Sequence, residues 1–471
     1  MGGTSDVTTS LPVDPIDELN EPALYRAVES RDRRFDGRVF VAVTSTGIYC
    51  RPVCPVPMPR PQNVRFYRWA AAAEAAGFRP CRRCRPELSP DSPDWDRRAD
   101  IVGRALDHIA RGTVERDGVA GLARRLAVSE RHLRRTFQQS LGVSVVQVAR
   151  SRRAHLARRL LEDTALSSTE VAFMAGFRSV RSYHETMAAV FAAPPLQLRK
   201  GPHPADGLLR LRLPYRPPLD WGAVLELLGE CAIPGVEEVT GHSYRRVVAL
   251  GGGPPSIVEV APTEDGPWLW LSFAMPPSAS IQRVVQGMRS RCDLDADLAA
   301  IEAALRGDPL LAPLVATRPG VRVPGAFDEF EGVVLAALVR TMPTPEAASQ
   351  AGQLAAATGT ALPQPSGTLT HAFPTPRQAG HARSGTTEAA AATAAIRILQ
   401  GSDGRPAADP DAFEPEASLL AAAHRAGWRG GPADLVARAE AWRPWRAYAA
   451  AHLRLANVAP SIPADGRGRN R

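Results

Sequence analysis

Residues 46–55 read TGIYCRPVCP and residues 76–84 read AGFRPCRRC, and these two stretches hold four of the six cysteines of the chain. The cysteines of the first stretch are four positions apart, those of the second are three apart, and 26 residues separate the two pairs. Two such pairs can close a tetrahedral shell of thiolates around zinc, each turn supplying two sulfurs about 2.3 Å from the metal. We therefore predict a zinc site whose ligands are Cys50, Cys54, Cys81 and Cys84.

The composition limits what the chain can be. Its 471 residues are enough for three or four domains. The 57 basic and 49 acidic residues leave a net charge of +8, and Lys200 is the one lysine, so nearly all of the positive charge is guanidinium, which favours phosphate recognition. Six cysteines are too few for a disulfide scaffold. No run of about 18 apolar residues could span a bilayer and no charged-then-apolar leader is found, so we expect a cytoplasmic protein with no membrane partner.

The positive charge is concentrated in residues 97–200, where 19 basic and 9 acidic residues give an excess of +10. Residues 118–137 predict two helices joined by a turn, because apolar residues recur at helical spacing and Ser129 can cap the second helix. Residues 168–191 repeat this pattern around a glycine turn. We predict two helix-turn-helix units that bind DNA. The alternative is a solvated basic bundle of helices.

The cysteine stretches carry a family resemblance. Together with residues 63–67 (NVRFY), they resemble the N-terminal zinc domain of the Ada family of DNA-methylation response proteins, over about residues 20–88, and residues 39–43 read as a strand. In that family the first cysteine accepts a methyl group from a methylphosphotriester in DNA, so the resemblance gives this catalytic role to Cys50. A zinc-bound thiolate is a nucleophile suited to a methyl carbon, and each molecule would act once because a thioether is not easily demethylated. The alternative is a purely structural zinc site.

The two helical units resemble the AraC-type DNA-binding domain, which reads two successive major-groove segments. The resemblance implies double-stranded DNA as the partner, at methylphosphotriester lesions and at promoter sites, and RNA polymerase as a further partner of an activator. The groove contacts are expected on the second helix of each unit, while the other arginines hold phosphates. The expected contacts are Arg131, His132, Arg134 and Arg135 in the first unit, and Ser179, Arg181 and Ser182 in the second.

The C-terminal half reads as a small α+β domain followed by helices. Residues 213–221 (LPYRPPLDW), 241–246 (GHSYRR) and 318–331 resemble the AlkA family of alkylpurine DNA glycosylases, and the resemblance returns at residues 373–376 and 441–448. We expect strands at residues 208–214, 247–250, 257–260 and 268–273, and helices at residues 280–288 and 298–305.

An active glycosylase of this family needs a Pro-Gly-hydrophobic-Gly turn that holds a DNA phosphate, and an aspartate that stabilises the positive sugar as the flipped base leaves. Neither is found. No such turn occurs between Phe373 and Ala441, and Ala417 stands at the position of the aspartate, with Glu416 one residue early. We therefore predict a degenerate glycosylase domain that serves as a weak DNA-binding or packing module. The alternative is an active 3-methyladenine DNA glycosylase with the N-terminal half as its targeting module.

Four further residues of this half are assigned to its core. Trp442 and Trp445 are expected to be core residues rather than a base-stacking platform. Cys231 and Cys292 have no partner pattern and are expected to be small buried side chains.

A Pro-Cys-His-Arg motif of the alkylguanine methyltransferases is absent from the sequence, so direct reversal of base methylation is not expected.

The predicted fold class is multidomain α+β, and the predicted function is an alkylation-damage response. The chain would accept a methyl group on a zinc-bound cysteine and act as a sequence-specific transcriptional activator. We expect a zinc domain at residues 1–92, an all-α DNA-binding domain at 93–200, a small α+β domain at 207–322, a mostly helical glycosylase-like domain at 323–460 and a tail at 461–471.

Overall fold

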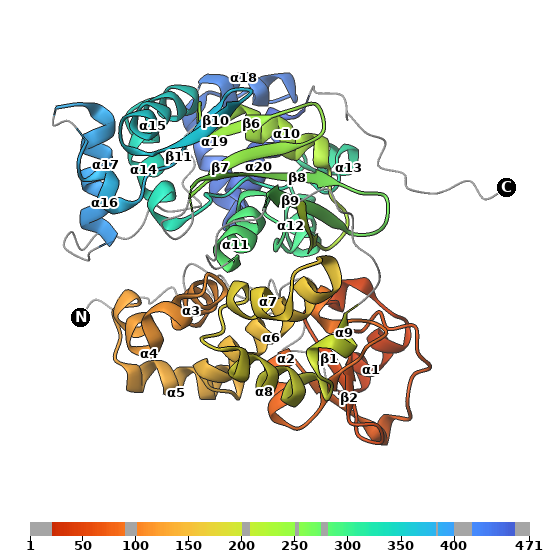
Figure 1. The fold of residues 1–471 in the computed structure, drawn as a ribbon. Coiled ribbons are helices and arrows are strands. Elements are labelled where there is room, and N and C mark those ends of the chain that lie inside the picture. The colour runs from red at the N-terminus through yellow and green to blue at the C-terminus, as the bar shows by residue number, and fades with distance from the viewer. Residues whose placement is uncertain are drawn as a thin grey trace, which may run out of the picture.

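The computed structural model describes residues 21–89, 101–199, 208–249, 254–274, 281–382, 385–399 and 417–456. Figure 1 shows two halves, one above the other, with a small sheet and a group of helices in the N-terminal half and a larger sheet with helices around it in the C-terminal half. The predicted multidomain α+β fold is confirmed. No helix in the described part of the chain is long and apolar enough to cross a bilayer.

The cysteine module, residues 21–89, is built on a four-stranded sheet in the order β3-β1-β2-β4. β1 is the strand expected at residues 39–43 and pairs antiparallel with β2 and β3, whereas β2 pairs parallel with β4. Because successive side chains of a strand point to opposite faces, β2 places Cys50 in one apolar cluster and Tyr49 in another. The elements are α1 (Glu21–Glu29), η1 (Arg33–Phe35), β1 (Phe40–Val43), β2 (Ile48–Cys50), η2 (Pro61–Asn63), β3 (Val64–Tyr67), α2 (Ala70–Ala75), β4 (Arg79–Pro80) and η3 (Pro86–Leu88).

The helical module, residues 101–199, contains both expected helix pairs. The first pair is the second part of α4, after its non-helical Gly118, with α5, and the second pair is α7 with α8. Ser129 caps α5 as predicted, by accepting a hydrogen bond from the His132 backbone N–H. The elements are α3 (Ile101–Ala110), α4 (Thr113–Arg125), α5 (Glu130–Leu141), α6 (Val145–Asp163), α7 (Ser168–Met174), α8 (Val180–Phe191) and α9 (Pro195–Leu198).

A five-stranded antiparallel sheet in the order β5-β9-β8-β7-β6 begins the C-terminal half. The strand expected at residues 247–250 begins three residues earlier, at Tyr244, and residue 250 lies outside the described residues. The elements are β5 (Leu208–Pro214), α10 (Trp221–Glu230), β6 (Glu237–Val239), β7 (Tyr244–Val248), β8 (Ser256–Pro262), β9 (Trp268–Ala274), α11 (Gln282–Arg291), α12 (Leu298–Leu305) and α13 (Ala312–Thr317).

Helices dominate the rest of the chain, together with a hairpin that the sequence did not predict. The hairpin strands β10 and β11 turn at Gly367 (φ 61°), and the prolines within β10 make it resemble a loop in sequence. The elements are α14 (Glu329–Val339), α15 (Thr344–Thr358), β10 (Thr360–Ser366), β11 (Leu369–Ala372), α16 (Pro376–Ala379), α17 (Thr387–Leu399), α18 (Ala417–Arg425), α19 (Pro432–Ala439), η4 (Glu440–Trp442) and α20 (Arg446–Arg454).

The two halves share one hydrophobic core. Side chains of α6, α7 and α8, among them Leu160, Val171 and Met187, belong to the same buried cluster as Leu211 of β5 and Met288 of α11. Since burial of each large apolar side chain contributes about 1.5–3 kcal/mol, this shared cluster holds the helical module firmly on the sheet.

Candidate metal centre and nucleic-acid interface

The four predicted ligand cysteines come together at one edge of the small sheet. One ligand sulfur from each cysteine lies within 4.8 Å of the other three, and the four residues are between 4% and 9% exposed. Cys50 ends β2, Cys54 follows in a turn, and Cys81 and Cys84 form a second turn after β4. Within the described residues this is the one group of three or more potential ligands with that spacing.

Backbone and side-chain donors surround these sulfurs. The Arg51 N–H donates to Cys84 Sγ at 3.3 Å, and the Arg83 N–H donates to Cys81 Sγ at 3.4 Å. The Arg51 guanidinium pairs with Asp36 and donates to the Cys84 carbonyl at 3.4 Å. Because donors of this kind stabilise negative charge on sulfur, the turns favour thiolates.

The thiols alone cannot all carry charge at this separation. Hydrogen bonds with Cys54 and Cys81 raise the pKa of Cys50, whereas the hydrogen bond with Cys50 lowers the pKa of Cys54 to about 7. Such opposite shifts are expected when neighbouring sulfurs share protons. Four buried sulfurs, the whole ligand group among the described residues, fit zinc, which replaces the protons and takes a tetrahedral thiolate shell.

The sulfur cluster is covered by α1 and by the loop after Cys54. Val28 of α1 packs in the same apolar cluster as the cysteines. The Tyr25 hydroxyl donates to the Pro59 carbonyl at 2.7 Å, and Arg31 donates to the Pro55 carbonyl at 3.2 Å. These two bonds hold the loop against α1 and against the turn that follows α1.

The four expected contact residues of the first unit lie on α5. Arg131, Arg134 and Arg135 are exposed, and His132 is half-buried. Arg134 pairs with Glu130 one turn earlier, at 2.9 Å. Arg131 and Arg135 therefore face solvent with no acidic partner on this helix, which suits contact with DNA.

The three expected residues of the second unit lie at the start of α8. Ser179 and Arg181 are exposed, and Ser182 is half-buried. The Ser179 hydroxyl accepts a hydrogen bond from the Ser182 backbone N–H at 3.2 Å, so it caps the helix. Arg181 pairs with Glu185 at 2.8 Å on the exposed surface. In Figure 1, α5 and α8 both lie on the lower side of the N-terminal half, away from the C-terminal half.

Exposed arginines of the cysteine module, which were not predicted as contacts from the sequence, extend this basic surface. Arg79 lies on β4, which contacts α8, and Arg82 and Arg83 lie between the second pair of cysteines. The position of these arginines inside the cysteine motif is the sequence signal that could have identified them as DNA contacts. The metal centre and the second recognition helix therefore adjoin each other.

Family models match three parts of the chain. A model of the metal-binding domain of Ada matches residues 23–87, a helix-turn-helix domain model matches residues 122–201, and a model of the AlkA N-terminal domain matches residues 210–328. A Mycobacterium tuberculosis protein described as a probable bifunctional transcriptional activator/DNA repair enzyme AlkA is 38% identical over 473 residues, which cover 91% of this chain and 95% of the relative. The chain belongs to this Ada-AlkA family.

Two other similar proteins match smaller parts of the chain. The bifunctional transcriptional activator/DNA repair enzyme Ada of Escherichia coli is 34% identical over 185 residues, or 39% of this chain and 50% of the relative. The solved DNA methyl phosphotriester repair domain of E. coli Ada is 46% identical, with 14% of this chain and 74% of that chain covered and a TM-score of 0.14. Zinc is the cofactor of the Ada-type cysteine module.

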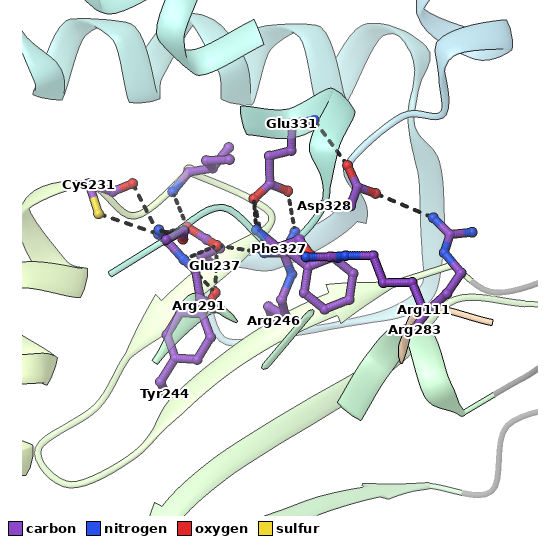
Figure 2. Close-up of polar contacts among 12 residues, drawn as sticks. Arg111, Cys231, Glu237, Tyr244, Arg246, Arg283, Arg291, Phe327, Asp328 and Glu331 are labelled. Carbon is purple, nitrogen blue, oxygen red and sulfur yellow. Dashed lines mark hydrogen bonds and ion pairs between the residues drawn. The ribbon is translucent and has the colours of Figure 1, made fainter. Parts of the chain in front are cut away.

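The AlkA-like half contains a buried network of charges at the junction of its sheet and helices (Figure 2). Arg246 binds Glu331 at 2.6 Å and Glu237 at 2.9 Å, and Arg291 binds Glu237 at 2.8 Å. The Tyr244 hydroxyl donates to Glu237 at 2.5 Å. Two carboxylates and two guanidinium groups balance each other here, so the network connects β6, β7, α11 and α14 without a net charge.

The other assignments in the AlkA-like half have mixed outcomes. Trp442 is buried and donates to Asp308 at 2.7 Å, and Trp445 packs partly buried against the same cluster, as predicted. Cys292 is buried as predicted, but Cys231, which follows the last residue of α10, is only half-buried, and its sulfur lies 3.4 Å from the Arg291 guanidinium. Helix α18 begins at Ala417, and Glu416 lies outside the described residues.

Proposed function

We propose that this chain senses alkylated DNA by accepting a methyl group from a methylphosphotriester onto Cys50, after which the helical module activates transcription at promoter sites. The observation that supports this most is the cluster of four buried sulfurs beside a strand, β4, that contacts the recognition helix α8. A purely structural zinc site would not need to adjoin a DNA-reading helix.

The proposed transfer is a single displacement at carbon. The Cys50 sulfur forms a bond to the methyl carbon, the bond from that carbon to the ester oxygen breaks, and its electron pair remains on the oxygen. The products are S-methylcysteine and a phosphodiester, and no proton moves because the sulfur starts as a thiolate. Bound zinc supplies this thiolate at neutral pH. Each molecule acts once because demethylation of the uncharged thioether would have to expel a thiolate, which is a poor leaving group.

The residues of the chain direct the DNA to this sulfur. The exposed Arg82 and Arg83 bind neighbouring phosphates, and the side chains proposed for base contact on α5 and α8 fix the register on a promoter. Loss of one negative charge from the sulfur cluster on methylation weakens its repulsion of the DNA backbone. The same proposal includes contact with RNA polymerase, action in the cytoplasm and the five domain ranges predicted from the sequence.

The proposal is tested by intact mass and zinc content before and after incubation with methylphosphotriester DNA. We expect a gain of one methyl group, mapped to the Cys50 peptide, with zinc retained. Cys50→Ser should gain none and should abolish promoter activation by a methylating agent. Cys231→Ser, which changes a half-buried cysteine outside the cluster, is the matched control and should behave as the parent protein. A promoter response that survives in Cys50→Ser would refute the sensor function.

For the C-terminal half we propose a degenerate glycosylase domain that serves in packing. The shared core with the helical module and the contacts to the cysteine module support this role. Incubation with an alkylated duplex should release no base above background. Turnover that is lost in Glu416→Gln would instead support an active glycosylase.

A further inference from the structure

Tyr49 and Cys50 are neighbours on β2 and point to opposite faces of the small sheet. Cys50 lies in the apolar cluster of the metal centre, whereas Tyr49 is fully buried in the cluster that faces α2. A strand is stiff across one residue, so a displacement of Cys50 also displaces Tyr49.

The Tyr49 side chain leads directly to the helical module. Its hydroxyl donates to Glu74 Oε1 of α2 at 2.9 Å, and His155 Nε2 of α6 contacts the same oxygen at 2.7 Å. The imidazole of His155 in turn packs edge-on against the ring of Phe191, the last residue of α8, with centroids 5.6 Å apart. Three side chains thus connect the methyl-acceptor strand with the recognition helix.

The second pair of cysteines has its own connection to the same place. Arg85, directly after Cys84, pairs with Glu162 of α6. Glu87 of η3 binds the Arg158 guanidinium of α6 at 3.0 Å, and that guanidinium lies over the Phe191 ring at 5.0 Å from its centroid. The side chains of Glu87, Arg158 and Glu162 are 2% exposed or less, so water screens these charges little.

Both connections converge on one face of α6. His155 and Arg158 are three positions apart, which places them side by side on a helix, and both contact Phe191. Each cysteine pair is therefore tied to the C-terminal end of α8 through a different residue of α6.

We propose that Tyr49, Glu74, His155 and Arg158 are positioning residues that couple the state of the metal centre to the placement of α8. This inference rests on the proposed function, since it concerns how methylation at Cys50 changes operator binding. Coupling between two sites is reciprocal and typically amounts to a factor of about 5–150 in affinity. The direct contact of β4 with α8 is a second route for coupling between the metal centre and α8. Variants in the Tyr49 connection interrupt only the first route and therefore distinguish the two.

The first experiment follows amide hydrogen exchange with and without zinc in the full chain. Zinc should slow exchange in α8 but not in α5, which takes part in neither connection. Tyr49→Phe keeps the buried ring and removes the hydroxyl donor, and it should reduce the zinc response of α8 by about fivefold. Tyr67→Phe makes the same chemical change on β3 and should leave that response unaltered. Equal zinc responses of α8 in Tyr49→Phe and in the parent would overturn the proposal.

The second experiment compares operator affinity before and after methylation. Tyr49→Phe should bind one zinc and accept one methyl group like the parent, but the gain in affinity on methylation should fall by about fivefold. Glu74→Ala, which breaks the connection at its centre, should do the same. An unchanged gain in both variants overturns the coupling. If the parent accepts no methyl group, the proposed function fails, while the zinc response of α8 still decides the coupling.

Discussion

The Arg216 guanidinium of the C-terminal half donates a hydrogen bond to the backbone carbonyl of Asp36 in the cysteine module, at 3.0 Å, across 180 positions of sequence. Arg216 is 7% exposed and Asp36 is 5% exposed. The carboxylate of the same Asp36 holds Arg51, whose backbone N–H donates to Cys84 Sγ. The AlkA-like half therefore supports one of the turns that hold the metal.

Arg216→Met should weaken this support. A hydrogen bond from a charged group contributes about 1.5–3 kcal/mol, so we expect the zinc-bound protein to lose that much stability and to release zinc to a chelator faster. Thermal unfolding and chelator competition measure the two effects. Arg306→Met removes a partly exposed pair with Glu302 inside the C-terminal half and should change stability by less than about 1 kcal/mol, with no effect on zinc release. Equal zinc release in both variants contradicts the prediction.

The metal centre could be predicted because the residues that form it lie close together in the sequence. All four cysteines lie within 35 positions, and the turn residues beside them restrict the backbone. The helix pairs were equally accessible, since Ser129 caps a helix whose apolar positions recur at helical spacing. Four of the five strands of the large sheet were also predicted, as in β5, whereas the three-residue β6 was not.

Contacts between distant segments could not be derived in this way. Arg246 and Glu331 are 85 positions apart, and a single sequence does not show that two oppositely charged residues are buried together. Exposed and buried arginines look alike in sequence, so neither Arg216 nor Arg158 could be separated from the arginines expected on DNA. The hairpin β10–β11 was missed because prolines at residues 363 and 365 outweighed its weak alternation.

The charge balance of the buried network can be tested by removing one of its charges. Burial opposes the charge on Arg246, but the Glu331 carboxylate raises its pKa, so Arg246 stays charged. Glu331→Gln removes one of two negative charges and leaves an uncompensated guanidinium, which should cost about 3–5 kcal/mol. The exposed Glu329→Gln on the same helix, α14, should change stability by less than about 0.5 kcal/mol. Denaturant unfolding of the two variants tests this prediction. Similar unfolding midpoints would contradict a network of balanced charges.

The turns of the two helix-turn-helix units differ at one equivalent position. Ala127 has a φ of 55° in the first unit, and Gly176 has a φ of 88° in the second. Only glycine adopts such angles without strain, so Ala127→Gly should stabilise the protein by about 0.5–1 kcal/mol.

The reciprocal change should act in the opposite direction. In Gly176→Ala the new methyl group meets Glu115 Cγ at 3.3 Å as well as the unfavourable φ, so we expect a loss of about 1–2 kcal/mol. Thermal unfolding measures the change in stability of each variant. A change of the same sign in both would show that φ does not control the stability of these turns.

A buried histidine predicts how stability depends on pH. His452 of α20 is 3% exposed, and burial together with the nearby Arg318 lowers its pKa to about 4. Its unfolded pKa is near 6.5, so the neutral imidazole stabilises the fold fully above pH 6.5, and this contribution is lost as the pH falls toward 4. The full difference corresponds to about 3 kcal/mol. Asp293, whose pKa burial raises to about 6, acts in the opposite sense over part of this range.

The contribution of His452 is isolated by a difference between two proteins. His452→Gln stays neutral at every pH, so its stability should fall less than that of the parent between pH 6.5 and 4, while Asp293 contributes equally to both curves. Urea unfolding at half-unit pH steps gives the two profiles. His381→Gln, at an exposed position, controls for the substitution itself. Parallel profiles for His452→Gln and the parent would mean that His452 gains a proton in the folded protein as easily as in the unfolded chain.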